Sequence, residues 1–118
     1  MRKIFVNVSM QNDAEQTIRL ALACCRYVRR CEMIPVASVY LFHDEERNSS
    51  RLEDPDLAHE YLVDVRICRE QMMDCDEVWI FKNRGPDDLM IMVKSMADEM
   101  ELEVQTFGED EICRLIMG

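Results

Sequence analysis

Asp87 and Asp88 are two adjacent carboxylates, and they are candidates for acid–base chemistry. They follow a short apolar run at residues 77–81 and a Gly85-Pro86 turn. Paired carboxylates can act as general acid and base, or can bind a metal ion. The same residues would also stand in the first turn of a helix that begins at Pro86, where the helix dipole stabilises acids. We favour this capping role, and acid–base chemistry remains the alternative.

Further candidate residues follow each of four apolar segments that we interpret as strands. Those after the first three are Asn7, Ser9, Met10, Gln11, Ser38, Tyr40, Asn83 and Arg84, and Thr106 and Gly108 follow from the fourth. The carboxyl ends of parallel strands meet at one edge of a sheet, so these residues, with Asp87, predict a polar crevice for a sugar or a base. Polar residues are also ordinary at strand ends, and the pattern alone leaves both interpretations open. The sequence contains no G-x-G-x-x-G and no Walker-type glycine loop, which argues against dinucleotides and nucleoside triphosphates.

The elements that position these residues alternate between apolar runs and amphipathic stretches. Strands are predicted at residues 3–8, 33–37, 77–81 and 103–107, and helices at about 13–30, 54–74, 86–100 and 109–117. The run at 77–81 is typical of a strand buried on both faces. Pro35 indicates a strand start or an edge position. This alternation predicts a three-layer α/β/α sandwich with a four- to five-stranded parallel Rossmann-like sheet, in the order 2-1-3-4.

Length and charge limit the classes of partner. The 118 residues predict a single domain over residues 1–118, and the formal net charge of −10 argues against nucleic acid as a partner. An acidic surface favours solubility, and the alternative is that it attracts a basic partner. No apolar run is long enough to span a bilayer, and the start of the chain enters a strand pattern without a signal peptide. We therefore expect a cytoplasmic protein with no membrane partner.

The cysteines and one group of arginines have structural interpretations. The six cysteines form no C-x-x-C pair and stand in no secretory context, so we expect core thiols in a reducing compartment, with neither a zinc site nor a disulfide scaffold. We also expect no metal and no cofactor. Arg26, Arg29 and Arg30 fall near the predicted end of the first helix, where positive charge offsets the helix dipole.

Six features occur in an order that resembles a known family. They are Ile4-Phe5-Val6, the predicted helix that ends near Val28, Ile34-Pro35-Val36-Ala37, Leu41-Phe42, Asp54-Pro55 and, most specifically, Cys75-Asp76-Glu77-Val78-Trp79-Ile80-Phe81. Over roughly residues 3–107 the chain resembles the small Rossmann-like domains related to nucleoside 2-deoxyribosyltransferases, many of them encoded by phages and their bacterial hosts.

The resemblance also implies which site elements are missing. In the enzymes of that superfamily, a glutamate four residues before a small residue of a late helix attacks the anomeric carbon. The small residue matches Ala97, so the nucleophile position falls on Val93, which cannot form a glycosyl ester. Asp87 matches a hydroxyl-binding acid of the family. The Ser-Pro-aromatic turn of the family is replaced by Val8-Ser9-Met10, and its Pro-His pair by Ser38-Val39.

The resemblance thus implies a non-catalytic protein that binds a small nucleoside- or nucleotide-like ligand, or an ADP-ribose derivative. One alternative is an N-glycosidic-bond enzyme, a deoxyribosyltransferase or nucleoside hydrolase, that uses Asp87 or Asp88. Another is an acidic phage-type inhibitor or interaction protein with a protein partner. The transferases complete their sites across a dimer, and the predicted helix at 54–74 has a wide apolar face, so we expect a homodimer or larger assembly. That face includes Ile67, Cys68, Met72 and Met73.

Overall fold

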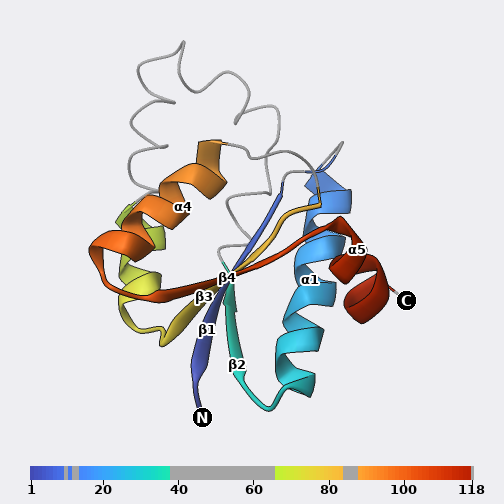
Figure 1. Cartoon of the computed structure of the whole chain (residues 1–118), viewed down its shortest axis with the longest axis horizontal. Helices are drawn as coiled ribbons and strands as arrows, with labels where there is room; N and C mark the ends of the chain where they lie inside the picture. Colours follow the sequence, from blue (N-terminus) through green and yellow to red (C-terminus); the bar gives the residue numbers. More distant parts are fainter. Residues whose placement is uncertain (10, 12–13, 38–65, 84–87, 118) are drawn as a thin grey trace.

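Four parallel strands form the centre of the molecule. The computed structural model describes residues 1–9, 11, 14–37, 66–83 and 88–117. The strands are β1 (Lys3–Val8), β2 (Ile34–Ala37), β3 (Glu77–Phe81) and β4 (Glu103–Phe107), paired in the order β2-β1-β3-β4 (Figure 1). The predicted parallel α/β sheet and its strand order are confirmed. Pro35 lies in edge strand β2, as its missing amide hydrogen requires, and no fifth strand joins the sheet within the described ranges.

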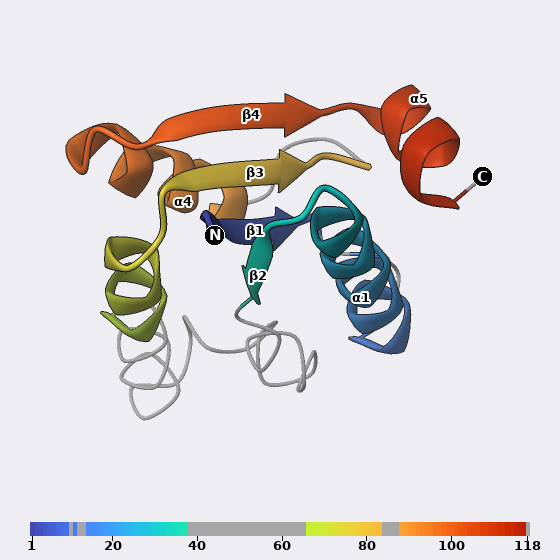
Figure 2. The same ribbon diagram turned by 90° about the horizontal axis from the view of Figure 1, so that it is seen from below.

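Helices cover both faces of this sheet (Figures 1 and 2). One face carries α1 (Ala14–Arg30) together with α5 (Glu109–Ile112) and the π-helix η2 (Cys113–Met117) that continues it. The other face carries α4 (Asp88–Glu99) and a helical segment over residues 66–73. The predicted three layers are therefore observed. The expected cap of the first helix at Asn12 or Asp13, the helix start at 54–56 and the Gly85-Pro86 turn lie outside the described residues.

Aromatic contacts show which side of each strand faces which layer. The ring of Tyr27, on α1, lies 6.1 Å from the ring of Trp79 and 6.0 Å from that of Phe107, so Trp79 and Phe107 face α1. Side chains alternate along a strand, and paired residues of parallel strands share a face. Asn7 and Ile80 are paired in the β1–β3 register. Both therefore face the layer that contains α4.

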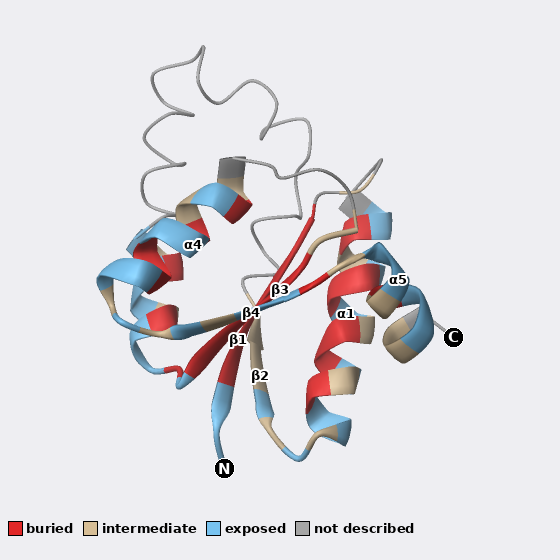
Figure 3. Ribbon diagram, viewed as in Figure 1, coloured by how far each residue is buried: buried red, intermediate tan, exposed pale blue. Residues whose placement is uncertain are grey.

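The core lies on both faces of β3, whose five residues are all buried, as the apolar run predicted (Figure 3). Val93 and Ala97 of α4 are fully buried against the sheet. All six cysteines are free, and burial raises the pKa of the Cys75 thiol to about 11, with a smaller contribution from Asp74. Within the described part of the chain, no helix is long and apolar enough to cross a membrane.

A buried carboxylate joins the amino-terminal ends of the central strands. Glu77 is paired with Arg2, whose Nη2 lies 2.9 Å from Oε2. The Oε1 atom of Glu77 accepts hydrogen bonds from Trp79 Nε1 at 3.4 Å and Gln105 Nε2 at 3.3 Å. These partners compensate the cost of removing the carboxylate from water. This end of the sheet is thus occupied by a structural network.

Both α1 and α4 lead into an edge strand through a glutamate in the left-handed conformation. The angle φ is 63° at Glu32 and 58° at Glu101. After α4, the amide of Leu102 donates to the carbonyl oxygen of Ala97 at 2.9 Å, and equivalent bonds follow α1. This pattern is the Schellman motif, in which the left-handed position favours glycine. Each glutamate therefore carries a strain that a glycine would relieve.

We expect Glu101→Gly to raise the free energy of unfolding by about 0.5 kcal/mol, because glycine adopts positive φ without the steric cost of a Cβ atom. Urea unfolding followed by the fluorescence of Trp79 measures the change. The control is Glu103→Gly, two residues later in β4, which should destabilise the protein by roughly the same amount. A loss of stability in both variants would contradict the capping role of Glu101.

Candidate functional site

The carboxyl ends of β1 and β3 lie at the point where the chain changes direction across the sheet. From β1 the chain passes through α1 on one face to β2, and from β3 it passes through α4 on the other face to β4 (Figure 2). The two connections therefore leave neighbouring strands in opposite directions. Doubly wound sheets bind their ligands in the crevice at this topological switch point. The predicted residues that follow β1 and β3 meet at this point.

Ser9 joins the ends of the two strands. Its amide and its hydroxyl both donate to the carbonyl oxygen of Phe81, at 3.0 Å and 3.2 Å. The Oγ atom of Ser9 also accepts a hydrogen bond from the amide of Asn83 at 3.0 Å. Ser9 is buried, and its hydroxyl proton is directed to Phe81. The hydroxyl therefore acts as a bridge between β1 and β3 rather than as a free donor for a ligand.

Side-chain amides extend this bridge at the switch point. Asn83 Nδ2 donates to Gln11 Oε1 at 3.0 Å, and Gln11 Nε2 donates to the carbonyl oxygen of Ser9 at 2.9 Å. The amide of Gln11 donates to the buried Thr17 Oγ1 at 2.9 Å, which ties the loop to α1. Among the described residues, none donates to Asn83 Oδ1. Within the described ranges, that oxygen is therefore an acceptor without a donor at the switch point.

Asn7 holds the second available acceptor. Its side chain is only 3% exposed, and its Oδ1 atom is buried without a hydrogen-bond partner. Leaving a buried carbonyl oxygen unpaired costs about 1–3 kcal/mol. Such exceptions are uncommon, and they often mark a place where water or a ligand supplies the missing donor. Asn7 faces the α4 layer beside Ile80, one residue before the end of β1.

The other candidate residues do not join this network in the described structure. Thr106 is exposed on β4, and the amide of Gly108 donates to Glu111 Oε1 at 3.1 Å at the start of α5, so neither joins the network. Asp88 begins α4, and its side chain is not described. The remaining candidates lie outside the described residues; they are Met10, Ser38, Tyr40, Arg84 and Asp87. The structure thus brings Ser9, Gln11 and Asn83 into one network, with Asn7 on the neighbouring β1.

The described groups at the switch point are neutral amides and a hydroxyl. Within the described ranges, no cluster of three or more His, Cys, Asp or Glu side chains is placed to hold a metal ion. Neutral amides match the hydroxyl groups of a sugar or the polar edge of a base better than the charge of a phosphate. Thr17 was not among the residues predicted for the site. Its spacing would have indicated that it is buried, because it stands four residues before the buried Ala21 on the same helix face.

Comparison of the chain with protein-family models, curated proteins and solved structures finds no match. What is established is therefore the Rossmann-like topology of four parallel strands in the order β2-β1-β3-β4. The relation to the nucleoside 2-deoxyribosyltransferases, and the roles of Asp87 and Asp88, stay predictions.

We expect Ser9→Ala to lower the free energy of unfolding by about 1–2 kcal/mol, because the amide of Asn83 loses its acceptor. Native-state hydrogen exchange should show a loss of protection at that amide. Gln11→Ala is the matched control, since it removes an outer link and leaves the Ser9 bridge in place. Unchanged exchange at Asn83 in Ser9→Ala would show that the hydroxyl does not join the strands.

Proposed function

We propose that this protein is a non-catalytic binder of a small nucleoside- or nucleotide-like ligand, or of an ADP-ribose derivative. The ligand binds at the switch point between β1 and β3. The observation that carries the proposal is the buried, unpaired Oδ1 atom of Asn7 beside the network of Ser9, Gln11 and Asn83. A ribose offers adjacent hydroxyl donors, and a base offers amino groups, that can satisfy such acceptors.

The hydrogen-bond network supports binding with selectivity. The bonds among Ser9, Gln11 and Asn83 hold the amide groups in place before a ligand arrives, which reduces the entropy that binding costs. A ligand that lacks a donor for Asn7 would leave the buried oxygen unpaired, so it would bind less tightly. We therefore propose that discrimination between ligands depends on a hydroxyl or amino group directed at Asn7.

The non-catalytic character rests on Val93. By the resemblance to the transferases, this residue occupies the position of the nucleophilic glutamate, and its side chain is fully buried in the core. An aliphatic side chain has no atom that can attack an anomeric carbon. The opposing hypothesis, N-glycosidic chemistry by Asp87 or Asp88, is tested by product analysis with deoxynucleosides. Turnover that Asp87→Ala abolishes would overturn the non-catalytic assignment.

The test of the binding site uses Asn7→Leu in thermal-shift titrations with adenosine, deoxyadenosine, adenosine monophosphate and ADP-ribose. At least one of these should stabilise the wild-type protein. Asn7→Leu should be more stable without ligand by about 1 kcal/mol, because it removes an unpaired buried oxygen, and should lose the ligand response. Thr106→Val, at an exposed position of β4, is the control and should keep the response. An unchanged response in Asn7→Leu, or no response of the wild type to any ligand, would refute the proposed site.

We further propose that the protein assembles as a homodimer or larger oligomer through the layer that contains α4. Two large apolar side chains of that layer are exposed, Met73 by 68% and Ile91 by 58%. Light scattering at high micromolar concentration should give at least twice the monomer mass, and Met73→Glu should lower that mass by placing a charge in the interface. A monomer mass for the wild-type protein would contradict the assembly.

A further inference from the structure

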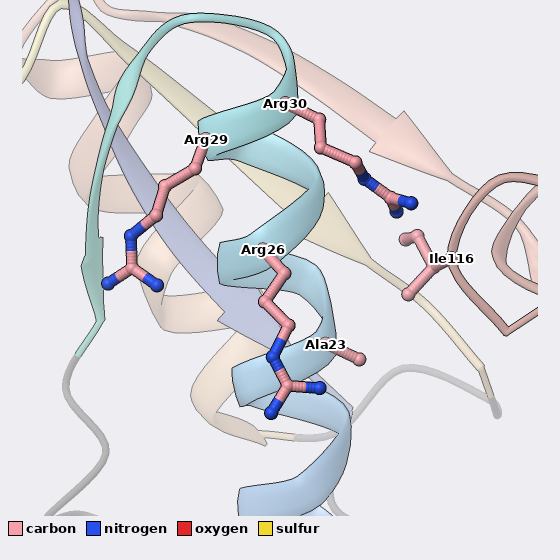
Figure 4. Close-up of a pocket in the computed structure, with 5 residues that line it drawn as sticks. All are labelled: Ala23, Arg26, Arg29, Arg30 and Ile116. Carbon is pink, nitrogen blue, oxygen red and sulfur yellow. The ribbon is translucent and has the colours of Figure 1, made fainter.

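A groove between α1 and η2 carries a concentration of positive charge on this acidic chain. The groove has a volume of ≈ 470 Å³ and is lined by Ala23, Arg26, Arg29, Arg30 and Ile116 (Figure 4). The arginines lie toward the carboxyl end of α1, whereas the switch point lies at the start of that helix. The groove is therefore separate from the proposed nucleoside site.

Two of the three arginines have no hydrogen-bond or ion-pair partner among the residues that the structure describes. Arg19, on the same helix, pairs with Glu15 at 2.6 Å. In the described part of the chain, Arg26 and Arg29 form no ion pair or hydrogen bond. Arg30 instead donates to the carbonyl oxygen of Leu115 at 3.2 Å. Arg30 thus helps to hold η2 against α1, which leaves the other two guanidinium groups for an anionic partner.

The helix dipole accounts for only part of this charge. Arg29 and Arg30 lie in the last turn of α1, where the dipole favours positive charge. Arg26 lies a turn earlier, beside the apolar Ala23, and Ile116 of η2 lines the groove as well. An arginine rim next to apolar side chains is a common composition of protein–protein interfaces. The groove therefore matches a partner that carries both carboxylates and apolar groups.

The geometry favours an extended ligand over a small anion. Figure 4 shows the three guanidinium groups pointing in different directions, so they do not converge on one phosphate-sized ion. Arg26 and Arg29 lie one turn apart on α1, and their guanidinium groups extend away from each other (Figure 4). Alternate side chains of an extended peptide are about 7 Å apart and point the same way. An extended segment with several carboxylates can therefore reach both Arg26 and Arg29, which one small anion cannot do.

We propose that this groove docks an extended acidic segment of a partner protein, in which carboxylates alternate with apolar residues. The carboxylates bind Arg26 and Arg29, and an apolar side chain packs on Ile116. Arginine suits this role because its planar guanidinium group binds carboxylates through two parallel hydrogen bonds.

The experiment measures the fluorescence anisotropy of a labelled peptide that alternates glutamate and leucine, with the corresponding glutamine–leucine peptide as the neutral probe. The acidic peptide should bind the wild-type protein more tightly than the neutral probe. Arg26→Gln/Arg29→Gln should weaken binding of the acidic peptide by about tenfold or more. Arg30 is left unchanged because it contacts η2. The control, Arg19→Gln/Lys94→Gln, removes the same charge at exposed positions outside the groove and should change binding less than about twofold.

Three results would overturn the proposal. Equal weakening in the two double variants would show that only net charge matters. Displacement of the peptide by equimolar inorganic phosphate would indicate a small-anion site. Self-association of the wild-type protein that Arg26→Gln/Arg29→Gln abolishes, measured by sedimentation velocity, would identify a second copy of this chain as the occupant.

Discussion

The parallel pairing of β1 with β3 is the interaction on which the rest of this structure depends. The two strands pair in register from Ile4 with Glu77 to Val8 with Phe81, and every residue of that register is buried. Backbone groups that are buried so completely must bond to one another, since water cannot reach them. The carboxyl ends of these parallel strands coincide, and because β2 lies beside β1 and β4 beside β3, right-handed crossovers leave toward opposite faces. The switch point therefore lies at the carboxyl end of this strand pair.

The fold could be predicted from the sequence because its buried strands begin and end sharply. β1, β3 and β4 have the predicted bounds: polar residues follow the buried runs of β1 and β3, and Gly108 follows the more exposed β4. β2 begins one residue later than predicted. The reason is that the amide of Met33 bonds to the carbonyl oxygen of Val28 at the end of α1, rather than to the sheet. The pattern of apolar residues does not predict which carbonyl oxygen a backbone amide bonds to, and no glycine marks this turn in the sequence.

The location of the candidate site could be predicted from the sequence, but the hydrogen-bonding roles of its residues could not. Strand ends indicated Asn7, Ser9 and Asn83, yet the sequence could not show that the Ser9 hydroxyl is directed to Phe81 while the Asn7 oxygen has no partner. These roles depend on neighbours 72 residues away along the chain, as the bond from Ser9 to Phe81 illustrates. The groove at Arg26 was missed for a similar reason, because it forms only where η2 packs against α1.

We propose that a nucleoside-like ligand binds through neutral amides at the switch point between β1 and β3. The most direct measurement is a ¹⁵N–¹H NMR titration of the labelled protein with adenosine and ADP-ribose. Binding at the switch point should give saturable shifts of the backbone signals of Ser9, Gln11 and Asn83 and of the side-chain amide of Asn7. Signals from residues 26–30 should stay in place. Shifts confined to the groove between α1 and η2, or no saturable shift at the switch point, would contradict nucleoside binding at the switch point.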